Sequence, residues 1–152
     1  MKVFIPYTAK RSPMIDAVRI CLMHERCKPH YRLMENDDSY YELVKSLWEK
    51  GDPFIVNEHD IVSWPGAIQQ LKDCPEPWCT FPYRAGCGMV KQSLGLAKFI
   101  PGLLTNVFAD ITYKHWGGLD MEIAKRLRTM FSPHVHEPPV TNLNPHIWLT
   151  SV

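Results

Sequence analysis

Apolar runs and amphipathic segments alternate along the first half of the chain, and this alternation constrains the fold more than any other feature. Short apolar runs stand at Lys2–Tyr7, His30–Glu35 and Pro53–Val56. Each run is followed by a segment whose apolar residues recur at helical spacing. Alternating strands and helices favour a parallel sheet with helices on its faces. We therefore predict an α/β fold with a mostly parallel central sheet, helices on both faces and the strand at residues 54–56 in the sheet interior.

The starts of the three predicted helices carry capping signals. Ser12 precedes a proline at the start of the first helix, and Ser39 with Glu42 forms a capping box at the second. Ser63, two residues before another proline, predicts the start of the third helix. These signals agree with the apolar pattern, so the first half of the chain should read strand, helix, strand, helix, strand, helix.

The second half has a more mixed pattern. Strands are predicted at Trp78–Tyr83 and Ser93–Phe99, and a short helix at Pro101–Phe108. An amphipathic helix is predicted at Gly118–Met130, where four apolar residues share one face. The last twenty residues read as loop, with a final strand at His146–Thr150.

Length and charge restrict the classes of function. A chain of 152 residues that is 45% hydrophobic fits one domain, residues 1–152. The formal net charge of +1 argues against a strong field for nucleic acid or membrane. The sequence contains no apolar run of membrane-spanning length, and its N-terminus reads as a first strand and not as a signal peptide. We expect a cytoplasmic protein without a membrane span.

The chain has an odd number of cysteines, namely Cys21, Cys27, Cys74, Cys79 and Cys87. Free thiols in a reducing cytoplasm are the favoured interpretation. A structural zinc site made by Cys74, Cys79 and Cys87 with a histidine stays open as an alternative, although paired CxxC motifs are absent.

Two acids, Glu58 and Asp60, directly follow the third apolar run. In a strand their side chains would point the same way, where two carboxylates repel each other and are costly to bury. A divalent cation would remove that penalty, because Mg²⁺ and Mn²⁺ prefer oxygen ligands and commonly bind carboxylates together with substrate phosphates. A solvated turn is the alternative reading of the pair.

Polar residues follow all three predicted strands, at 6–8, 35–38 and 57–60. Ligands of open α/β sheets bind at the carboxyl ends of the strands. We expect these three segments to converge on one crevice.

A third feature is the segment "HWGGLD", which ends at Asp120 and leads into an amphipathic helix. Asp120 is expected in the first helical turn, where the helix dipole would keep it ionised. It is either a helix-end acid or a carboxylate placed to take a proton. Further on, His134, His136 and His146 lie in a proline-rich stretch that could supply a metal ligand or a phosphate contact.

Together these motifs resemble the GT-A class of glycosyltransferases, which use nucleotide-sugar donors. Glu58-His59-Asp60 stands where that class has a DxD-like motif, and "WGGLD" is similar to the WGGxD segment of inverting galactosyltransferases. The first acid of the motif is Glu here, and the chain is much shorter than typical members. A small enzyme of phage or bacterial type fits the resemblance.

The resemblance implies a Rossmann-like GT-A fold, with a nucleotide-binding half at residues 1–73 and an acceptor or catalytic half at 74–152. It also implies a set of roles. Mn²⁺ or Mg²⁺ would be bound by Glu58 and Asp60 with His136 or His146, and Asp120 would be the catalytic base. The partners would be a nucleotide-diphosphate sugar and an unknown acceptor, which is a glycan, a small molecule or a modified nucleic acid. The residues expected to hold the nucleotide are Pro6, Tyr7, Thr8, Glu35, Asp37 and Asn57.

Two other functions stay open at this point. One is a nucleotide or nucleotide-sugar binding module without catalysis. The other is a metal-dependent hydrolase that uses Glu58, Asp60 and the late histidines.

Overall fold

Six strands form one central sheet in the computed structural model, which describes residues 1–8, 12–86, 88–92, 94–112 and 114–143. The order across the sheet is β2-β1-β3-β8-β5-β9. These strands are β1 (Lys2–Tyr7), β2 (His30–Leu33), β3 (Phe54–Asn57), β5 (Trp78–Thr80), β8 (Leu96–Phe99) and β9 (His134–Val135). The helices are α1 (Ser12–His24), α2 (Ser39–Lys50), α3 (Ala67–Asp73) and α4 (Trp116–Leu127), with a 3-10 helix η2 (Pro101–Leu103).

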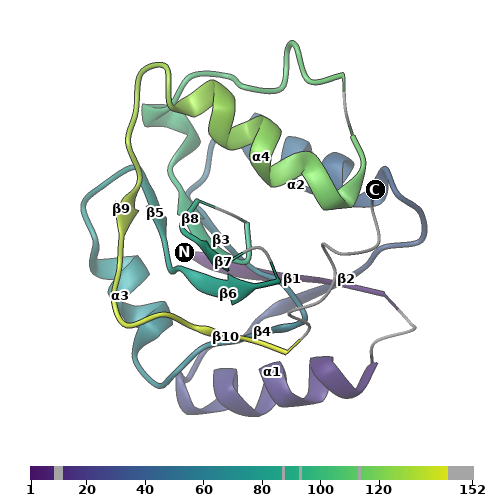
Figure 1. The fold of residues 1–152 in the computed structure, drawn as a ribbon, viewed down its shortest axis with the longest axis vertical. Coiled ribbons are helices and arrows are strands. Elements are labelled where there is room, and N and C mark those ends of the chain that lie inside the picture. The colour runs from purple at the N-terminus through teal and green to yellow at the C-terminus, as the bar shows by residue number, and fades with distance from the viewer. Residues whose placement is uncertain (9–11, 87, 93, 113, 144–152) are drawn as a thin grey trace.

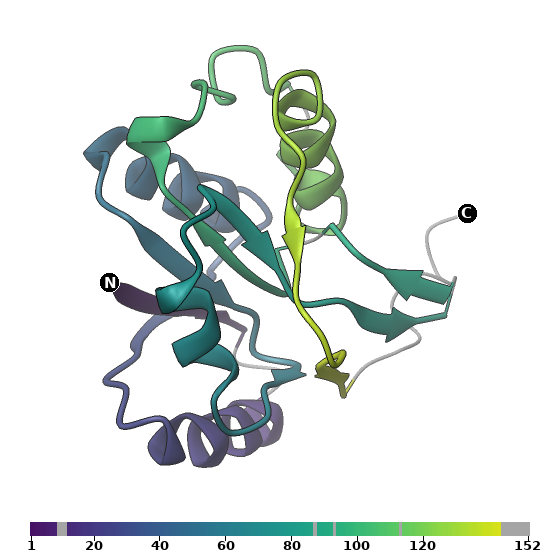
Figure 2. The same cartoon turned by 90° about the vertical axis from the view of Figure 1, so that its left-hand side faces the viewer.

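Two small two-stranded sheets flank the central one. They pair β4 (Ile61–Val62) with β10 (Thr141–Asn142), and β6 (Tyr83–Ala85) with β7 (Gly88–Val90). The β6–β7 hairpin projects from the body of the molecule (Figure 2).

The central sheet is mostly parallel. Strand β1 pairs in parallel with β2 and β3, and β9 pairs in parallel with β5, whereas β8 runs antiparallel to both β3 and β5. Strand β3 lies between β1 and β8, and Ile55 is fully buried. The predicted α/β class, the parallel first three strands and the interior position of β3 are therefore confirmed, and strands from both halves of the chain share the sheet.

Helices cover both faces of the sheet, so the architecture has three layers (Figure 1). Successive residues of a strand point to opposite faces. Phe4 and Val56 accordingly lie in a core with residues of α2 and α4, whereas Ile5 and Ile55 lie in a second core with residues of α1 and α3. Each large side chain that is fully buried in these cores contributes about 1.5–3 kcal/mol to stability.

The third helix starts later than the sequence predicts. Ser63 lies before a turn, and α3 begins only at Ala67, after Gly66 in a left-handed conformation (φ 98°). The residues just before Ser63 form β4, whose partner β10 is about eighty residues further along the chain. A local sequence window cannot show such a pairing.

Three other boundaries also differ from the sequence prediction. Ser39 is the first residue of α2 and hydrogen-bonds Asn36, so the predicted capping box does not form. The predicted strand at 78–83 is divided between β5 and β6, because Pro82 has no N–H to donate. The last predicted helix begins two residues early, since the ring of His115 accepts a hydrogen bond from the Gly117 N–H at 3.1 Å.

The C-terminal region contains two short strands, β9 and β10, where the sequence predicts loop. The predicted final strand at His146–Thr150 lies outside the described residues. Only the 3-10 helix η2 forms within the predicted helix at 101–108. None of the helices in the described part of the chain reaches both the length and the hydropathy of a membrane-spanning segment.

Candidate functional site

The turn between β3 and β4 carries the acid pair. Its shape depends on Asn57, which is fully buried and whose side-chain amide donates to the carbonyls of Glu58 (2.9 Å) and Ile61 (2.8 Å). Strand β3 ends at Asn57, so both acids lie in the turn and not in a strand. The expectation that strand alternation aligns Glu58 with Asp60 is therefore wrong, and the turn sets their directions instead.

Glu58 is held by the first turn of α2. The phenolic hydroxyl of Tyr40 donates to Oε1 of Glu58 at 2.8 Å, and the N–H of Glu58 donates to the carbonyl of Gly95 at 2.8 Å. Tyr40 is fully buried. Burial, followed by the charge and hydrogen bond of Glu58 and then by the charge of Asp120, raises the pKa of Tyr40 well above its usual range. Tyr40 therefore stays protonated and acts as a donor.

His59 joins the turn to two other parts of the fold. Its Nδ1 lies 3.2 Å from the carbonyl oxygen of Pro6, at the end of β1. Its ring also meets the ring of Trp116 edge to face, with centroids 5.8 Å apart, and Trp116 in turn packs against Tyr40 at 4.6 Å. The end of β1, the β3–β4 turn and the starts of α2 and α4 are thus brought together.

The acid pair is compatible with a hard divalent cation. Asp60 is only 6% exposed, and Glu58 is half-buried. The Oδ1 atom of Asn57, the last residue of β3 before the turn, is buried with no hydrogen-bond partner among the described residues. These groups offer oxygen atoms only, and two carboxylates suffice for an ion whose other ligands are water and substrate phosphates. The described residues contain no group of three His, Cys, Asp or Glu ligand atoms that includes either acid.

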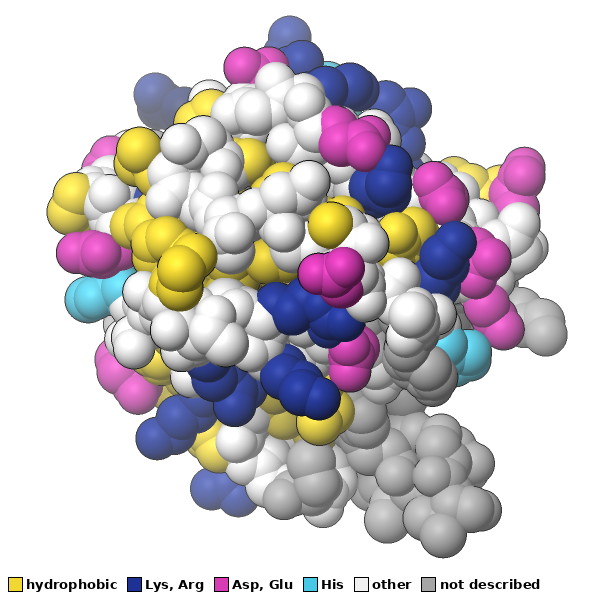
Figure 3. Space-filling model, turned by 90° about the horizontal axis from the view of Figure 1, so that it is seen from above, with side chains coloured by type: hydrophobic (Ala, Val, Ile, Leu, Met, Phe, Trp, Pro, Cys, Tyr) yellow, Lys and Arg dark blue, Asp and Glu magenta, His cyan; other side chains and the backbone are white. Residues whose placement is uncertain are grey.

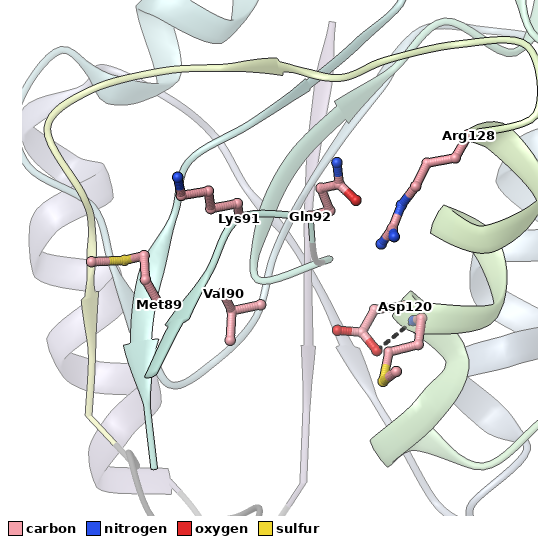
Figure 4. Close-up of a pocket in the computed structure, with 7 residues that line it drawn as sticks. Met89, Val90, Lys91, Gln92, Asp120 and Arg128 are labelled. Atoms are coloured by element: carbon pink, nitrogen blue, oxygen red, sulfur yellow. Dashed lines mark hydrogen bonds between the residues drawn. The ribbon is translucent and has the colours of Figure 1, made fainter. Parts of the chain in front are cut away.

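Asp120 lies in α4 and faces a pocket of about 430 Å³. It lines this pocket together with Met89, Val90, Lys91, Gln92, Met121 and Arg128. The Asp120 carboxylate points into the pocket from α4, and the Arg128 guanidinium does so from just after the end of α4 (Figure 4). Val90, the last residue of β7, lies across from them. The pocket therefore combines one acid, two basic groups and an apolar wall.

The charge state of Asp120 is set by burial. Because α4 begins at Trp116, Asp120 lies beyond the first turn, where the dipole acts most strongly. Burial raises the pKa of Asp120 to about 6. The N–H of Met121 donates to Oδ1 of Asp120 at 2.7 Å, and this hydrogen bond lowers the pKa and so offsets part of the effect of burial. The expectation that Asp120 lies in the first helical turn is therefore wrong, and burial is the largest influence on its pKa. A carboxylate with a pKa near 6 is instead matched to proton transfer near neutral pH.

The residues predicted to hold the nucleotide differ in their burial. Tyr7 and Thr8 are half-buried at the end of β1, and Glu35 is exposed. Asp37 is exposed and lies 3.7 Å from Nε2 of His115, which connects the start of α2 to the start of α4. The predicted segments after β1 and β3 do meet, through Pro6 and His59.

The predicted ligand His136 does not lie with the acid pair. His136 lies with Cys74 and Cys79, where its ligand atom is within 4.8 Å of both sulfur atoms. His146 lies outside the described residues, as does Cys87.

Sequence reasoning missed several residues of this region. Tyr40 and Trp116 have aromatic rings that fit the apolar pattern, so the sequence indicates only core residues. It does not show that Tyr40 hydrogen-bonds Glu58 or that Trp116 packs against His59. Lys91 and Arg128 belong to no sequence motif that would have indicated them. The basic residues on the α4 side are interspersed with acidic and hydrophobic ones (Figure 3), so no single-sign patch would have indicated them.

Comparison with protein-family models and with curated proteins finds no match for the chain. Among solved structures, the fold is similar to a protein described as a glucose-1-phosphate thymidylyltransferase from Bacillus anthracis, in complex with sucrose. That similarity has a TM-score of 0.53 and 10% identity, and covers 92% of this chain and 87% of the other. A glycosyltransferase involved in glycosylation of the PBCV-1 major capsid aligns with a TM-score of 0.44 at 10% identity, over 91% and 83% of the chains. The first comparison supports a Rossmann-like α/β fold of the kind that nucleotidyltransferases have.

Proposed function

We propose that the chain is a metal-dependent glycosyltransferase of the GT-A type, which moves a sugar from a nucleotide-diphosphate sugar to an acceptor hydroxyl. The observation that carries this proposal is the position of Tyr40, which joins the turn of the acid pair to the start of α4. Its hydroxyl binds Glu58, and the charge of Asp120 also acts on it. An acid suited to metal and diphosphate binding and an acid suited to act as a base would then serve one donor and acceptor.

In this proposal the donor diphosphate binds at the β3–β4 turn. Glu58 and Asp60 would hold Mn²⁺ or Mg²⁺, and the bound cation would neutralise charge on the diphosphate leaving group. The hydrogen bond from Tyr40 fixes the position of one carboxylate oxygen of Glu58. The nucleotide would be held by Pro6, Tyr7, Thr8, Glu35, Asp37 and Asn57.

The acceptor would occupy the pocket beside α4, where Asp120 takes the proton of its hydroxyl group. The acceptor oxygen then attacks the anomeric carbon of the donor sugar. The bond from that carbon to the diphosphate oxygen breaks, and the electron pair leaves with the diphosphate. Attack from the face opposite the leaving group inverts the anomeric configuration, in keeping with the "WGGLD" segment. The acceptor can be a glycan, a small molecule or a modified nucleic acid.

The similarity to a thymidylyltransferase supports the proposal at the level of fold. The name of that protein implies a nucleotide and a sugar phosphate as reactants, which are also the two parts of a nucleotide-sugar donor. A binding module or a metal-dependent hydrolase would use the same acid pair, so experiment has to separate these three functions.

The test is a thermal-shift screen of nucleotide diphosphates and nucleotide sugars, with and without Mn²⁺. A ligand at a hundredfold excess over its Kd raises apparent stability by about 2.7 kcal/mol. We expect one nucleotide to stabilise the protein only when Mn²⁺ is present. Sugar transfer to an added acceptor then identifies a transferase, release of sugar into water a hydrolase, and binding without turnover a binding module. The absence of any nucleotide-dependent shift would contradict the proposal.

A further inference from the structure

A cluster of sulfur and nitrogen ligands lies on the face of the sheet that α3 covers. Its members are Cys74 in the loop after α3, Cys79 in β5 and His136 just after β9. Their ligand atoms all lie within 4.8 Å of one another, and the two sulfur atoms are 2.8 Å apart. Because the three residues come from different elements, only the complete fold brings them together.

The backbone around each of the three residues is fixed. The N–H of Cys74 donates to the Gln70 carbonyl at 3.0 Å, which closes the last turn of α3. Cys79 is fully buried within β5, which β8 and β9 flank in the sheet. The N–H of His136 donates to the carbonyl of Thr80 at 2.8 Å. The cluster is thus preorganised by the sheet and by the end of α3.

The ring of His136 has an unexplained polar atom. Its Nε2 is buried and has no hydrogen-bond partner among the described residues. The ring stacks on Phe81, with centroids 5.0 Å apart, and meets the ring of His134 edge to face at 4.5 Å. Leaving a buried polar atom without a partner costs about 1–3 kcal/mol. An ion bound at Nε2 would give this atom a partner, whereas a disulfide between the two cysteines would not.

We propose that Cys74, Cys79 and His136 bind a zinc ion, with the fourth position left to solvent. Thiolate and imidazole are the ligands that Zn²⁺ takes most often, and one histidine with two cysteines is an established ligand set for it. The set differs in kind from the oxygen groups of Glu58 and Asp60, so the two sites would select different metals.

The arrangement needs only a small adjustment to accept the ion. With Zn–S distances of about 2.3 Å and tetrahedral angles, two thiolate ligands lie roughly 3.8 Å apart. The sulfur atoms therefore have to separate by about 1 Å. Cys74 is half-buried in the loop after α3, so its side chain has more room to move than that of Cys79.

Lys98 provides charge compensation at this site. It is fully buried on β8 opposite Cys79, and its ammonium group donates to the carbonyl of Cys74. The charge of Lys98 lowers the pKa of the Cys79 thiol, against the larger effect of burial. The described residues contain no acid that pairs with it. Two thiolates neutralise the charge of Zn²⁺, and the ammonium then faces sulfur atoms that carry negative charge.

Metal analysis and Co²⁺ spectroscopy of the full chain test this proposal under reducing conditions. We expect purified protein to contain about one zinc ion per chain. Co²⁺ added to metal-free protein should give the intense charge-transfer absorption of thiolate ligands. Cys79→Ser and His136→Gln should each raise the Kd for Co²⁺ by at least about 100-fold. Cys21→Ser changes a free, half-buried cysteine of α1 and is the matched control, which should bind Co²⁺ as the wild type does.

Asp60→Ala separates this site from the proposed donor site. It should keep the thiolate–Co²⁺ absorption while losing nucleotide binding with Mn²⁺. If either cluster variant fails to fold, the wild-type spectrum still decides the matter. Reduced wild-type protein without thiolate–Co²⁺ absorption, or a Cys74–Cys79 disulfide recovered in place of bound metal, would overturn the proposal. Equal loss of absorption in Cys21→Ser would do the same.

Discussion

The hydroxyl of Tyr40 donates a hydrogen bond of 2.8 Å to Oε1 of Glu58 and so joins the first turn of α2 to the β3–β4 turn. The two residues are 18 positions apart in the chain. Because Tyr40 is fully buried, its hydroxyl has little freedom to turn elsewhere. The bond fixes one side of Glu58, and the proposed donor site depends on that fixed orientation.

Tyr40→Phe removes this bond and keeps the buried ring. A hydrogen bond to a charged group is worth about 1.5–3 kcal/mol, so we expect the Kd of a nucleotide diphosphate with Mn²⁺ to rise about tenfold or more. Calorimetry measures this directly. Tyr41→Phe, at the next position of α2, is the control and should leave the Kd unchanged. Unchanged binding in Tyr40→Phe, together with lower stability, would assign the bond to the fold alone.

Asp60→Ala should abolish metal-dependent nucleotide binding. It removes a carboxylate that is buried at the turn, whereas Asp52→Ala, just before β3, removes an exposed one and serves as the control. Both variants are titrated with a nucleotide diphosphate in the presence and absence of Mn²⁺. Binding by Asp60→Ala that still depends on Mn²⁺ would remove the acid pair from the site.

The pH dependence of sugar transfer should follow Asp120. A base acts only when deprotonated, and the pKa of Asp120 is raised to about 6. We therefore expect kcat/KM to be constant above about pH 7 and to fall about tenfold per pH unit below pH 6. Initial rates between pH 5 and 8 give the profile. A profile that stays flat down to pH 5 would rule out a base with this pKa.

The raised pKa of Asp120 also predicts that the stability of the protein depends on pH. The pKa of Asp120 is about 6 in the folded protein, whereas 3.8 is the ordinary value expected in the unfolded chain. Between these two pH values the folded state therefore binds more protons than the unfolded state. The free energy of unfolding must then fall as the pH rises through this window. Asn does not titrate. Relative to wild type, Asp120→Asn should therefore gain on the order of 2 kcal/mol in stability between pH 3.5 and pH 8.

Urea unfolding of both proteins across this pH range measures the difference. A stability difference that does not change with pH would mean that the carboxyl group has an ordinary pKa in the folded protein.

The sequence predicts those parts of the fold that depend on local pattern. Apolar alternation places Ile55 in an interior strand, and the helical stripe identifies α4 with an error of only a few residues at each end. The sequence does not predict the start of α3, because the preceding residues pair with β10 from far along the chain. Long-range pairing is the information that a local window lacks.

The candidate site is predictable only as a set of residue types. The sequence singles out Glu58, Asp60 and Asp120, but it does not show that Tyr40 hydrogen-bonds Glu58, because a tyrosine at helical spacing looks like any core residue. It also predicts the charge state of Asp120 from the helix dipole, whereas burial is the larger effect. His136 shows the same limit, since only the fold places it beside Cys74 and Cys79.

The central claim is that Asp120 is the base of a sugar-transfer reaction, and Asp120→Asn tests it most directly. Asn keeps the shape of the side chain and removes its basicity. Once the screen has identified the donor, transfer is measured for both proteins alongside calorimetry of the nucleotide with Mn²⁺. We predict that binding stays within a few fold while transfer falls at least about a hundredfold. Full transfer activity in Asp120→Asn would contradict the account.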